Sequence, residues 1–294
     1  MKLLVTGATG FIGSHLIKRL VTDNHSVHVL VRPSTNTDTL KKENVTLHVF
    51  NDSVTDLISH MQTEHFDGVI HLASLFLAQH KSEDIKNLID SNVYFSTAVL
   101  EASVKSSIPW FINTGTFWQH YNDAEYSPVN LYAATKQAFE DIAKYYTETS
   151  ALNFVTIKLS DTFGPNDTRS KIFNLWLKIS KSKEPLDMSP GEQILDMSFV
   201  DNVIEGYATM IELLNKDSEK KLKGKSFAIT SNERMSLKKL AELFEQTTGF
   251  KLNINWSKKD YRPREVMIPW SKGQKIPGWK PLVSIKEGIK KLYE

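Results

Sequence analysis

The sequence predicts an α/β fold in which a doubly wound parallel sheet is joined by a smaller C-terminal lobe. Short β-branched runs alternate with longer amphipathic runs through the first half of the chain. The short runs are almost continuously apolar, as strands buried on both faces require. The chain has 294 residues, enough for one large domain or two closely joined ones.

The first half of the chain supplies the elements of the predicted sheet. The strands are predicted at Lys2–Thr6, Ser26–Val31, Val45–Phe50, Gly68–Leu72, Pro109–Thr114 and Phe154–Leu159. Apolar residues three and four apart predict helices at Phe11–Val21, Val54–Gln62, Asp84–Val104 and Leu131–Tyr146. Because strands joined by helices run parallel, helices should cover both faces of the sheet.

The pattern loosens after Gly164-Pro165, and we expect the smaller lobe to begin near residue 166. Some of its segments should return to the first domain. Two helices are predicted in it, Ser236–Thr248 with Ser236 as N-cap, and Ser284–Leu292 with a capping box. The basic run Lys216–Lys225 is interpreted as a solvated loop.

Composition excludes several classes of protein. With 40% hydrophobic and 24% charged residues the chain is not disordered, and its net charge of +2 gives no reason to expect nucleic acid or a membrane as partner. The absence of cysteine excludes disulfides, thiolate metal sites and a cysteine nucleophile. No run approaches the ~20 apolar residues of a membrane span, so we expect a cytoplasmic protein.

A glycine-rich turn joins the first strand to the first helix. In Thr6-Gly7-Ala8-Thr9-Gly10-Phe11-Ile12-Gly13, the glycines permit a tight turn, close approach to a pyrophosphate and close packing of helix on strand. The helix N-terminus adds free N–H groups and positive potential. This strand–turn–helix context predicts a dinucleotide site of the Rossmann type.

The end of the second strand favours NADP over NAD. An acidic residue there would accept hydrogen bonds from the ribose of NAD, whereas the strand ends in Leu30-Val31-Arg32. Arg32 offers a charged fork to a 2′-phosphate, although a solvated arginine is the alternative. Asp52 is a candidate to accept from the adenine amino group, and it is equally a candidate cap for the helix that starts near Ser53.

A tyrosine and a lysine lie one helical turn apart in Tyr132-Ala133-Ala134-Thr135-Lys136. A nearby ammonium favours the phenolate, so we expect the pKa of Tyr132 to be lowered from ~10 toward neutrality, which suits a general acid or base. Thr114-Gly115-Thr116 ends a strand that leads toward this pair, and the combination predicts a catalytic site.

With these features the chain resembles, over nearly its whole length, the extended short-chain dehydrogenase/reductases that act on nucleotide sugars. The other matching segments are His71-Leu72-Ala73-Ser74, Asn92-Val93, Phe163-Gly164-Pro165, Phe199-Val200-Asp201 and Gly278-Trp279-Lys280-Pro281. The resemblance implies a dinucleotide-binding domain over residues 1–165 and a nucleotide-sugar lobe over residues 166–294. It also implies a homodimer that pairs through the helices at 84–104 and 131–146.

The resemblance assigns roles to individual residues. It implies that Thr116 hydrogen-bonds the reacting oxygen, Tyr132 transfers the proton and Lys136 holds the nicotinamide ribose. The implied cofactor contacts are Gly7, Thr9, Gly10, Phe11, Ile12, Gly13, Arg32, Asp52, Ser53, Leu72, Ala73, Ser74, Asn92, Tyr132 and Lys136. The implied substrate contacts are Thr114, Thr116, Phe117, Trp118, Asp161 and Arg262, the last of them to phosphate.

Departures from the family pattern reduce the number of reactions to be considered. Dehydratases of the family place an Asp-Glu pair after the catalytic threonine, where this chain has Phe117-Trp118, and the fucose-type enzymes use a cysteine that this chain lacks. Asp161 replaces a family asparagine, and Leu195 replaces an arginine before Asp196.

Three segments resemble the branch of CDP-abequose and CDP-paratose synthases, namely Asn113–His120, Lys158–Asp161 and Leu186–Glu192. That resemblance implies NADPH-dependent reduction of a CDP-4-keto-3,6-dideoxyglucose at carbon 4, in deoxysugar synthesis for O-antigen polysaccharide. The alternatives are an NAD-dependent nucleotide-sugar 4-epimerase and a dinucleotide-binding regulator without chemistry. Loss of Tyr132 or Lys136 would be the signature of the regulator, and both are present.

The loop after Thr116 is a candidate wall of the sugar pocket, because open α/β sheets bind ligands at the carboxyl ends of their strands. Trp118, Gln119, His120 and Tyr121 belong to it. His71 is interpreted as a core histidine rather than a catalytic base. No set of His, Asp and Glu has metal-ligand spacing, so no metal is expected.

Overall fold

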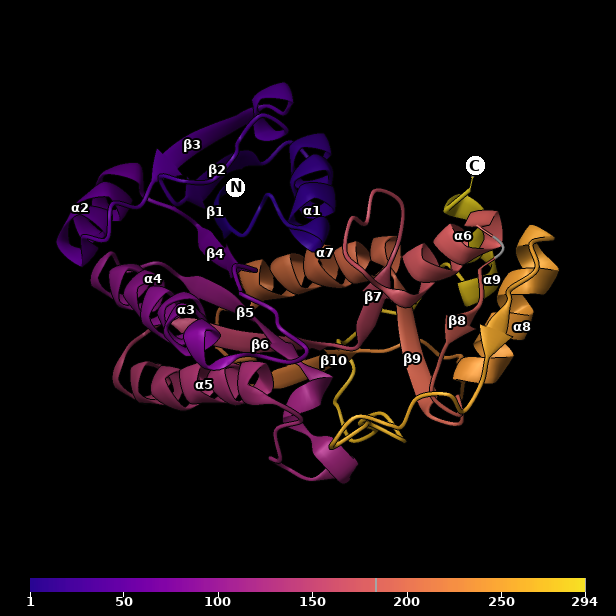
Figure 1. Cartoon of the computed structure of the whole chain (residues 1–294). Coiled ribbons are helices and arrows are strands. Elements are labelled where there is room, and N and C mark those ends of the chain that lie inside the picture. The colour runs from indigo at the N-terminus through magenta and orange to yellow at the C-terminus, as the bar shows by residue number, and fades with distance from the viewer. Residues whose placement is uncertain (183, 294) are drawn as a thin grey trace.

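A seven-stranded parallel sheet forms the larger part of the computed structural model, which describes residues 1–182 and 184–293 (Figure 1). The strands follow the order β10-β6-β5-β4-β1-β2-β3, and the predicted doubly wound α/β class is confirmed. Their bounds are β1 Lys2–Thr6, β2 Ser26–Val31, β3 Val45–Val49, β4 Gly68–His71, β5 Trp110–Thr116, β6 Asn153–Leu159 and β10 Ser226–Ile229.

Helices cover both faces of this sheet. Figure 1 shows α1 (Phe11–Thr22) beside α7 (Val200–Lys216) on one face, and α2 (Val54–Glu64), α4 (Phe95–Lys105) and α5 (Leu131–Thr149) on the other. Alternate residues of one strand enter different cores: Leu3 and Val5 pack on the α1 side, and Leu4 packs on the α2 side. This two-sided burial is why the strands are apolar throughout.

The helix predicted at residues 84–104 is interrupted. It consists of a 3₁₀ turn η2 (Ser82–Asp84), α3 (Ile85–Ile89), a π turn η3 (Asp90–Tyr94) and α4. Asn92 lies in the middle of the π turn with its side chain fully buried. Because the π turn is wider than an α-helical turn, the Asn92 amide points toward the loop after β4. The spacing of apolar residues in the sequence does not reveal this tertiary contact.

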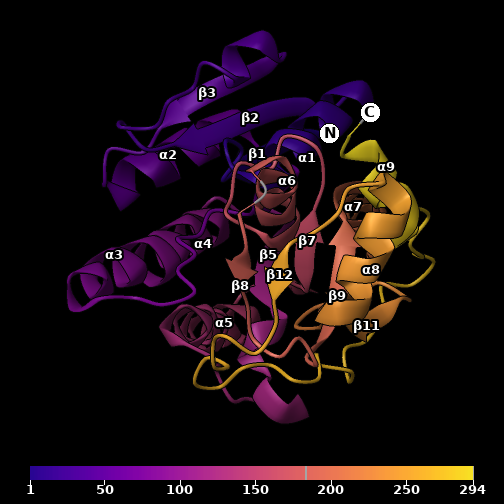
Figure 2. The ribbon, with the colours of Figure 1, turned by 45° about the vertical axis from the view of Figure 1, so that its right-hand side comes forward.

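The smaller lobe lies beyond β6 along the chain. It contains the sheet β11-β9-β7, the pair β12-β8 and three helices, which Figure 2 shows on the side of the molecule away from α3. Their bounds are β7 Asp161–Phe163, α6 Ile172–Ser182, β8 Leu186–Asp187, β9 Ile194–Phe199, β11 Arg234–Ser236, α8 Leu237–Thr248, β12 Ile254–Asn255 and α9 Ile285–Lys291. The predicted caps are confirmed, because Ser236 accepts from Lys239 N–H and Ser284 forms a capping box with Glu287.

Two segments between these lobe elements join the larger part: α7 packs on α1, and β10 pairs with β6. The remaining short helices are η1 (Leu40–Lys42), η4 (Phe117–Gln119) and η5 (Tyr121–Asp123). None of the helices in the described residues is long and apolar enough to span a membrane.

Parallel pairing brings the carboxyl ends of the central strands to one edge of the sheet. Thr6 of β1 is in register with His71 of β4, and Thr116 of β5 is in register with Leu159 of β6. The loops that follow these strands, and the start of α5, therefore meet at this edge.

Candidate active site

The turn between β1 and α1 forms a cradle in which glycines leave the backbone open to a ligand. Gly7 has a positive φ of 72°, and a Cβ atom on it would lie 2.6 Å from the Ala73 nitrogen. A Cβ atom on Gly13 would lie 2.1 Å from the Gly7 carbonyl oxygen. Gly10 is the N-cap of α1 and has no side chain, so the first N–H groups of the helix have no capping oxygen and can receive an anion.

Lys136 supplies the second part of the cofactor fit. Its side chain is only 1% exposed, and its Nζ has no hydrogen-bond or ion-pair partner among the described residues. Burial lowers the pKa of Lys136 to about 8, although the charge of Glu140 partly opposes this. A buried ammonium requires acceptors, and ribose hydroxyls would provide them. The glycine cradle and Lys136 therefore fit a bound dinucleotide.

The end of β2 presents Arg32 as predicted. This residue follows the strand directly and is exposed, and its guanidinium has no partner among residues 1–182 and 184–293. The structure also decides between the two interpretations of Asp52. Ser53 caps α2 by accepting from Asp56 N–H at 3.2 Å, so Asp52 is not the cap. The exposed Asp52 carboxylate accepts instead from the Tyr94 hydroxyl.

Tyr132 lies beside the hydroxyls of Ser74 and Thr116, which hydrogen-bond its phenol. Burial raises the pKa of Tyr132 to about 12, because desolvation of the phenolate outweighs the favourable effects of Ser74, Arg169 and Thr116. The expectation that Lys136 lowers this pKa toward neutrality is therefore wrong for this structure. The phenol carries its proton at neutral pH, which is the state of a general acid.

Asn92 holds the loop after β4 in place. Its Oδ1 accepts from Leu75 N–H at 2.7 Å and from the Ser74 hydroxyl at 3.2 Å. Its Nδ2 donates to the Leu75 carbonyl and to Thr135 Oγ1 at 3.0 and 2.9 Å. These four bonds use the whole capacity of the amide. The predicted contact of Asn92 with a cofactor stays a prediction, and in this structure the amide positions Ser74 beside Tyr132.

The same loop covers the glycine cradle. Ala73 N–H donates to Thr6 Oγ1 at 3.2 Å, and Leu72 N–H donates to the Thr6 carbonyl at 3.3 Å. His71 is fully buried between Thr6 Oγ1 and Ser96 Oγ, each 2.8 Å from a ring nitrogen. The interpretation of His71 as a core histidine is confirmed.

An aromatic wall stands next to Tyr132. The ring of Phe76 is 39% exposed and lies 5.0 Å from the Tyr132 ring and 5.5 Å from the Trp118 ring. Lys171 Nζ lies 4.8 Å from the centre of the Phe76 ring. The Arg262 guanidinium lies 5.7 Å from the centre of the Trp118 ring. The wall therefore brings together two predicted substrate residues, Trp118 and Arg262, with Phe76, which the sequence did not indicate.

Three cations gather around Asp161. Lys171 Nζ lies 2.8 Å from its carboxylate, and the charges of Arg169 and Arg262 also act on it. Burial alone would raise the pKa of Asp161, but these cations outweigh burial and lower it. Arg169 also lies 4.5 Å over the ring of Phe11, the first residue of α1. Each cation has a carboxylate partner, because Arg169 also pairs with Asp167 at 2.7 Å and Arg262 with Glu265 at 3.0 Å, so three carboxylates balance the three positive charges.

Sequence reasoning missed Arg169 and Lys171. The available signal was a pair of cations two residues apart, shortly after Gly164-Pro165 at the end of a strand. Phe76 and the buried Tyr207 gave no signal, because their positions depend on contacts with residues far along the chain.

Several predicted pocket residues point elsewhere. Phe117 packs edge-on against Trp270 at 5.2 Å in a small apolar cluster. Thr114 Oγ1 lies 2.6 Å from the hydroxyl of buried Tyr207, so the Thr114 hydroxyl has a hydrogen-bond partner within the protein. Tyr121 lies under the Arg264 guanidinium, 4.2 Å away. Phe117 thus packs within the protein, and its substrate contact stays a prediction.

Gln119 and His120 also lie outside the predicted sugar pocket. Gln119 is fully buried; it accepts from Thr116 N–H at 2.9 Å and donates to Glu140 at 2.9 Å. His120 is 7% exposed and lies 2.9 Å from Lys158 Nζ. The expectation that both line the sugar pocket is wrong, because the 3₁₀ turn η4 directs them to the opposite side of Thr116.

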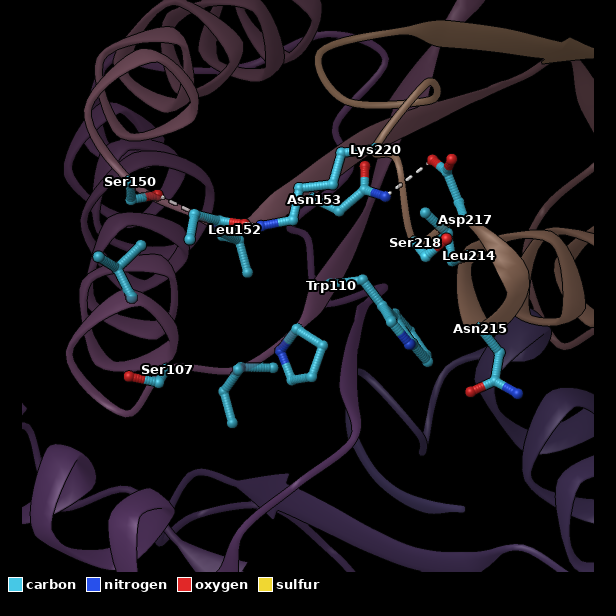
Figure 3. Close-up of a pocket in the computed structure, with 14 residues that line it drawn as sticks. Ser107, Trp110, Ser150, Leu152, Asn153, Leu214, Asn215, Asp217, Ser218 and Lys220 are labelled. Atoms are coloured by element: carbon cyan, nitrogen blue, oxygen red, sulfur yellow. Dashed lines mark hydrogen bonds between the residues drawn. The ribbon is translucent and has the colours of Figure 1, made fainter.

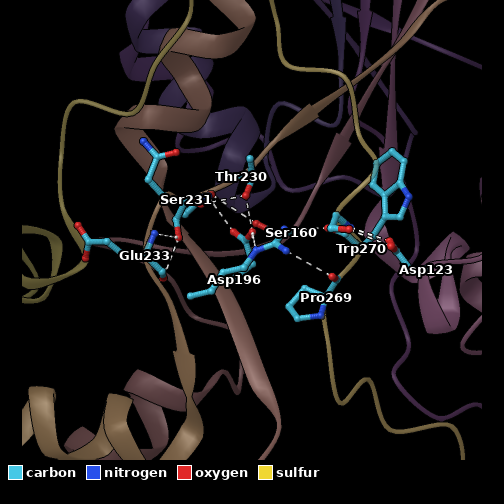
Figure 4. Close-up of polar contacts among 12 residues, drawn as sticks. Asp123, Ser160, Asp196, Thr230, Ser231, Glu233, Pro269 and Trp270 are labelled. Carbon is cyan, nitrogen blue, oxygen red and sulfur yellow. Dashed lines mark hydrogen bonds and ion pairs between the residues drawn. The ribbon is translucent and has the colours of Figure 1, made fainter.

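A network in the smaller lobe fixes the segment after Arg262 (Figure 4). Asp196 accepts from Arg234 Nε at 2.9 Å, and Arg234 Nη2 donates to the Trp270 carbonyl at 2.8 Å. Asp123 accepts from Ser271 N–H and Oγ, both at 2.8 Å. The segment is thus anchored to β9 on one side and to η5 on the other.

A cavity of about 450 Å³ lies at the opposite edge of the sheet (Figure 3). Ser107 and Trp110 line it at the start of β5, and Leu152 and Asn153 line it at the start of β6. Lys220, from the predicted basic loop, donates to a carbonyl there. This cavity contains none of the predicted site residues.

The sequence profile of the NAD dependent epimerase/dehydratase family matches residues 3–223. The chain belongs to this family. It is an enzyme of the extended short-chain dehydrogenase/reductase type, and the predicted resemblance is confirmed.

Individual proteins that resemble this chain in sequence or in fold are consistent with membership of this family. CDP-abequose synthase of Salmonella typhimurium is 28% identical, covering 99% of this chain and 97% of the relative. CDP-abequose synthase of Yersinia pseudotuberculosis is 24% identical over 92% of each chain. Among solved structures, UDP-glucose 4-epimerase of Thermotoga maritima with UDP-glucose shares the fold with a TM-score of 0.85 and 20% identity, covering 99% of this chain and 97% of that chain. UDP-glucuronic acid 4-epimerase of Bacillus cereus, in complex with UDP-glucuronic acid and NAD, gives a TM-score of 0.84 at 23% identity, covering 100% and 98%.

Proposed function

We propose that the protein is an NADPH-dependent reductase of a nucleotide-linked 4-keto-deoxysugar, acting at carbon 4 as a cytoplasmic homodimer. The observation that carries this proposal is the position of the Tyr132 phenol beside the Thr116 hydroxyl, at the edge of the sheet where the glycine cradle opens. The favoured substrate is a CDP-4-keto-3,6-dideoxyglucose, used in deoxysugar synthesis for surface polysaccharide.

The residues divide the chemistry among them. Bound NADPH would supply a hydride to carbon 4. Gly7, Gly10 and Gly13 would hold its pyrophosphate and Lys136 its nicotinamide ribose. Thr116 orients the keto oxygen, and Tyr132 donates a proton to that oxygen as negative charge develops on it.

One observation favours reduction over epimerisation. Arg32 follows β2 with no acidic residue beside it, an arrangement that suits the 2′-phosphate of NADPH. A reductase consumes its reducing equivalent, whereas an epimerase returns the hydride to its own substrate.

The substrate class rests on the neighbouring side chains. Arg169, Lys171 and Arg262 would bind the diphosphate of a nucleotide sugar. Phe76 and Trp118 present apolar surface next to Tyr132, which suits a sugar that has lost hydroxyl groups. CDP is favoured over UDP because CDP-abequose synthases are relatives over nearly the whole chain.

An NAD-dependent nucleotide-sugar 4-epimerase is the second candidate, since UDP-sugar 4-epimerases share the fold. One experiment distinguishes the two functions. Purified protein is mixed with NADPH and with CDP-, UDP- and dTDP-linked 4-keto sugars, and nicotinamide absorbance is followed. We expect stoichiometric NADPH oxidation that is fastest with the CDP-linked sugar. Interconversion of a UDP-hexose pair with catalytic NAD, and no net nicotinamide consumption, would contradict the proposal.

A further inference from the structure

A buried glutamine, Gln119, connects the strand that carries Thr116 to the helix that carries Tyr132. Gln119 lies in the 3₁₀ turn η4, and its side chain is fully buried. Its Oε1 accepts from Thr116 N–H at 2.9 Å. Its Nε2 donates to Gln137 Oε1 at 2.8 Å and to Glu140 Oε1 at 2.9 Å. Because both acceptors belong to α5, the side chains of Gln119, Gln137 and Glu140 form a clamp between β5 and α5.

The same turn holds the Thr116 hydroxyl. Thr116 Oγ1 accepts from Trp118 N–H at 3.2 Å, and Thr116 and Gln119 form a capping box at the start of η4. The Thr116 hydroxyl also hydrogen-bonds the Tyr132 phenol. Since Trp118 N–H already uses one lone pair of this oxygen, the hydroxyl hydrogen is left to be donated toward Tyr132 or a bound keto oxygen. The η4 turn therefore sets the direction of the Thr116 hydroxyl.

Glu140, the charged member of the clamp, is itself held by a buried lysine. Lys158 Nζ of β6 lies 3.1 Å from Glu140 Oε2, and the two side chains are 5% and 13% exposed. His120 Nε2 lies 2.9 Å from the same Nζ, and His120 Nδ1 lies 3.1 Å from the Ala124 carbonyl oxygen. A neutral imidazole satisfies both contacts when Nδ1 donates to Ala124 and Nε2 accepts from Lys158. Each group behind Glu140 therefore has a partner that keeps it in place.

Gly115 leaves the space that the clamp occupies. A Cβ atom on Gly115 would lie 2.9 Å from Gln119 Oε1, from Glu140 Oε1 and from Lys158 Cγ. A side chain at this position would therefore separate the hydrogen-bonded atoms of Gln119 and Glu140. The clamp fits closely against the backbone of the catalytic strand.

We propose that Gln119 is a positioning residue for the reduction, because it holds the Thr116 hydroxyl in register with the Tyr132 phenol. This inference rests on the proposed reductase function and deepens it. In that function both groups must reach the same keto oxygen, Thr116 to orient it and Tyr132 to protonate it. They come from different elements, and the sheet pairs β5 with β4 and β6, so side chains must hold β5 to α5. The clamp supplies polar contacts of this kind directly behind Thr116.

A double-mutant cycle with Thr116 separates positioning from a structural role. Gln119→Met keeps the length of the side chain but loses its hydrogen bonds, and we expect kcat to fall by roughly tenfold to a hundredfold, since a small displacement of Thr116 misorients the keto oxygen. The KM for the sugar and the Kd of NADPH should change by less than about twofold. In the Thr116→Val background, Gln119→Met should lower kcat by less than about twofold, because the hydroxyl that it positions is already absent.

Asn153→Leu is the matched control. It removes another buried side-chain amide, which donates to Asp217 at 3.0 Å at the opposite edge of the sheet. We expect this variant to lower the melting temperature while kcat stays unchanged in both backgrounds. Loss of a buried amide alone would therefore not reproduce the effect of Gln119→Met.

Reversal of donor and acceptor tests the clamp independently, and it also serves if Gln119→Met does not fold. Gln119→Glu keeps an acceptor for Thr116 N–H but places a carboxylate against Glu140, so kcat should fall. Addition of Glu140→Gln supplies an amide that donates to the carboxylate at position 119 and accepts from Lys158. We expect the double variant to recover most of the lost kcat, and a double variant no faster than Gln119→Glu would count against the clamp.

The outcomes distinguish the inference from the function on which it rests. An equal fold-loss of kcat from Gln119→Met with and without the Thr116 hydroxyl, or no loss at all, would overturn the positioning role alone. Failure of the wild type to oxidise NADPH with any 4-keto sugar would overturn the proposed function and the positioning role together.

Discussion

At the scale of single residues, Tyr132 shows how its surroundings decide its chemistry. The isolated spacing of Tyr132 and Lys136 favours a lowered phenol pKa, yet burial raises the pKa of Tyr132 to about 12 and lowers that of Lys136 to about 8. Lys136 is buried and Tyr132 is partly buried at the start of α5, where desolvation disfavours the charged form of each. The pair is therefore suited to proton donation.

Tyr132→Phe removes that proton while keeping most of the ring's shape. We expect turnover to fall by roughly 10²–10⁴, with NADPH affinity almost unchanged, because the side chain acts on the transition state and not on the bound cofactor. Steady-state rates and fluorescence titration would measure the two effects. Lys136→Met should instead lower both affinity and rate, and a near-wild-type turnover of Tyr132→Phe would show that another group is the acid.

Arg32 should set the choice of cofactor. A charge-assisted contact to the 2′-phosphate contributes about 1.5–3 kcal/mol, which corresponds to roughly a tenfold to hundredfold preference for NADPH over NADH. Arg32→Ala should remove most of this preference by weakening NADPH binding alone. Dissociation constants for both cofactors would test this, and tighter binding of NADH by the wild type would contradict it.

At the scale of elements, the close approach of β1, α1 and the loop after β4 forms the cofactor cradle. Gly7 touches the backbone at Ala73, and Gly13 touches the Gly7 carbonyl. The π turn η3 contributes from a distance, because it aims Asn92 at the loop that carries Ser74. The cradle thus depends on three separate chain segments being placed together.

Gly13→Ala tests the cradle. Its Cβ would lie 2.1 Å from a backbone oxygen, so α1 must shift, and we expect a loss of roughly 1–3 kcal/mol in the free energy of unfolding together with weaker NADPH binding. Gly10→Ala is the matched control, since its Cβ would lie 3.2 Å from the same oxygen and φ there is −75°. It should lose much less stability in urea denaturation; equal losses would mean that the Gly13 contact is not limiting.

At the scale of the whole molecule, burial of neutral histidines links stability to pH. Burial lowers the pKa of His48 to about 4, with the neighbouring His60, His28 and Lys2 adding to the effect and Glu64 opposing it. The pKa of His120 is also lowered to about 4, again mainly by burial. The unfolded chain binds these protons near pH 6.5, so the folded state loses stability as pH falls from 6.5 toward 4.

His48→Asn should reduce this dependence. We expect the melting temperature of the variant to fall less steeply than that of the wild type over the same range, because one group that protonates on unfolding has been removed. Melting curves at several pH values would measure the difference. Parallel slopes for the two proteins would contradict the assignment of this acid sensitivity to His48.

Assembly is the second property at this scale. Ile85 and Ile89 of α3 are 46% and 42% exposed, and Tyr145 of α5 is 64% exposed. We predict that these apolar side chains are covered in a homodimer formed through the two helical segments. Light scattering at micromolar concentration should give twice the mass of the chain, and Ile89→Lys should shift it to the monomer. A monomeric wild type would count against this prediction.

Features that depend on near neighbours along the chain can be predicted from the sequence. The strand–helix alternation and the one-turn spacing of Tyr132 and Lys136 follow from periods of two and 3.6 residues. The glycine turn and the caps at Ser236 and Ser284 follow from residue types at fixed positions. The NAD dependent epimerase/dehydratase family could be recognised from these local motifs alone.

Contacts between residues far apart in the chain depend on the complete fold. Phe76 reaches Tyr132 because the loop after β4 folds over α5, and Arg169 and Lys171 meet Asp161 where the smaller lobe begins. The directions of the side chains in η4 and the pKa of Tyr132 likewise depend on contacts with segments far apart in the chain. Such contacts leave no period in the sequence, because desolvation and packing depend on what lies across the fold and not on what lies next along the chain.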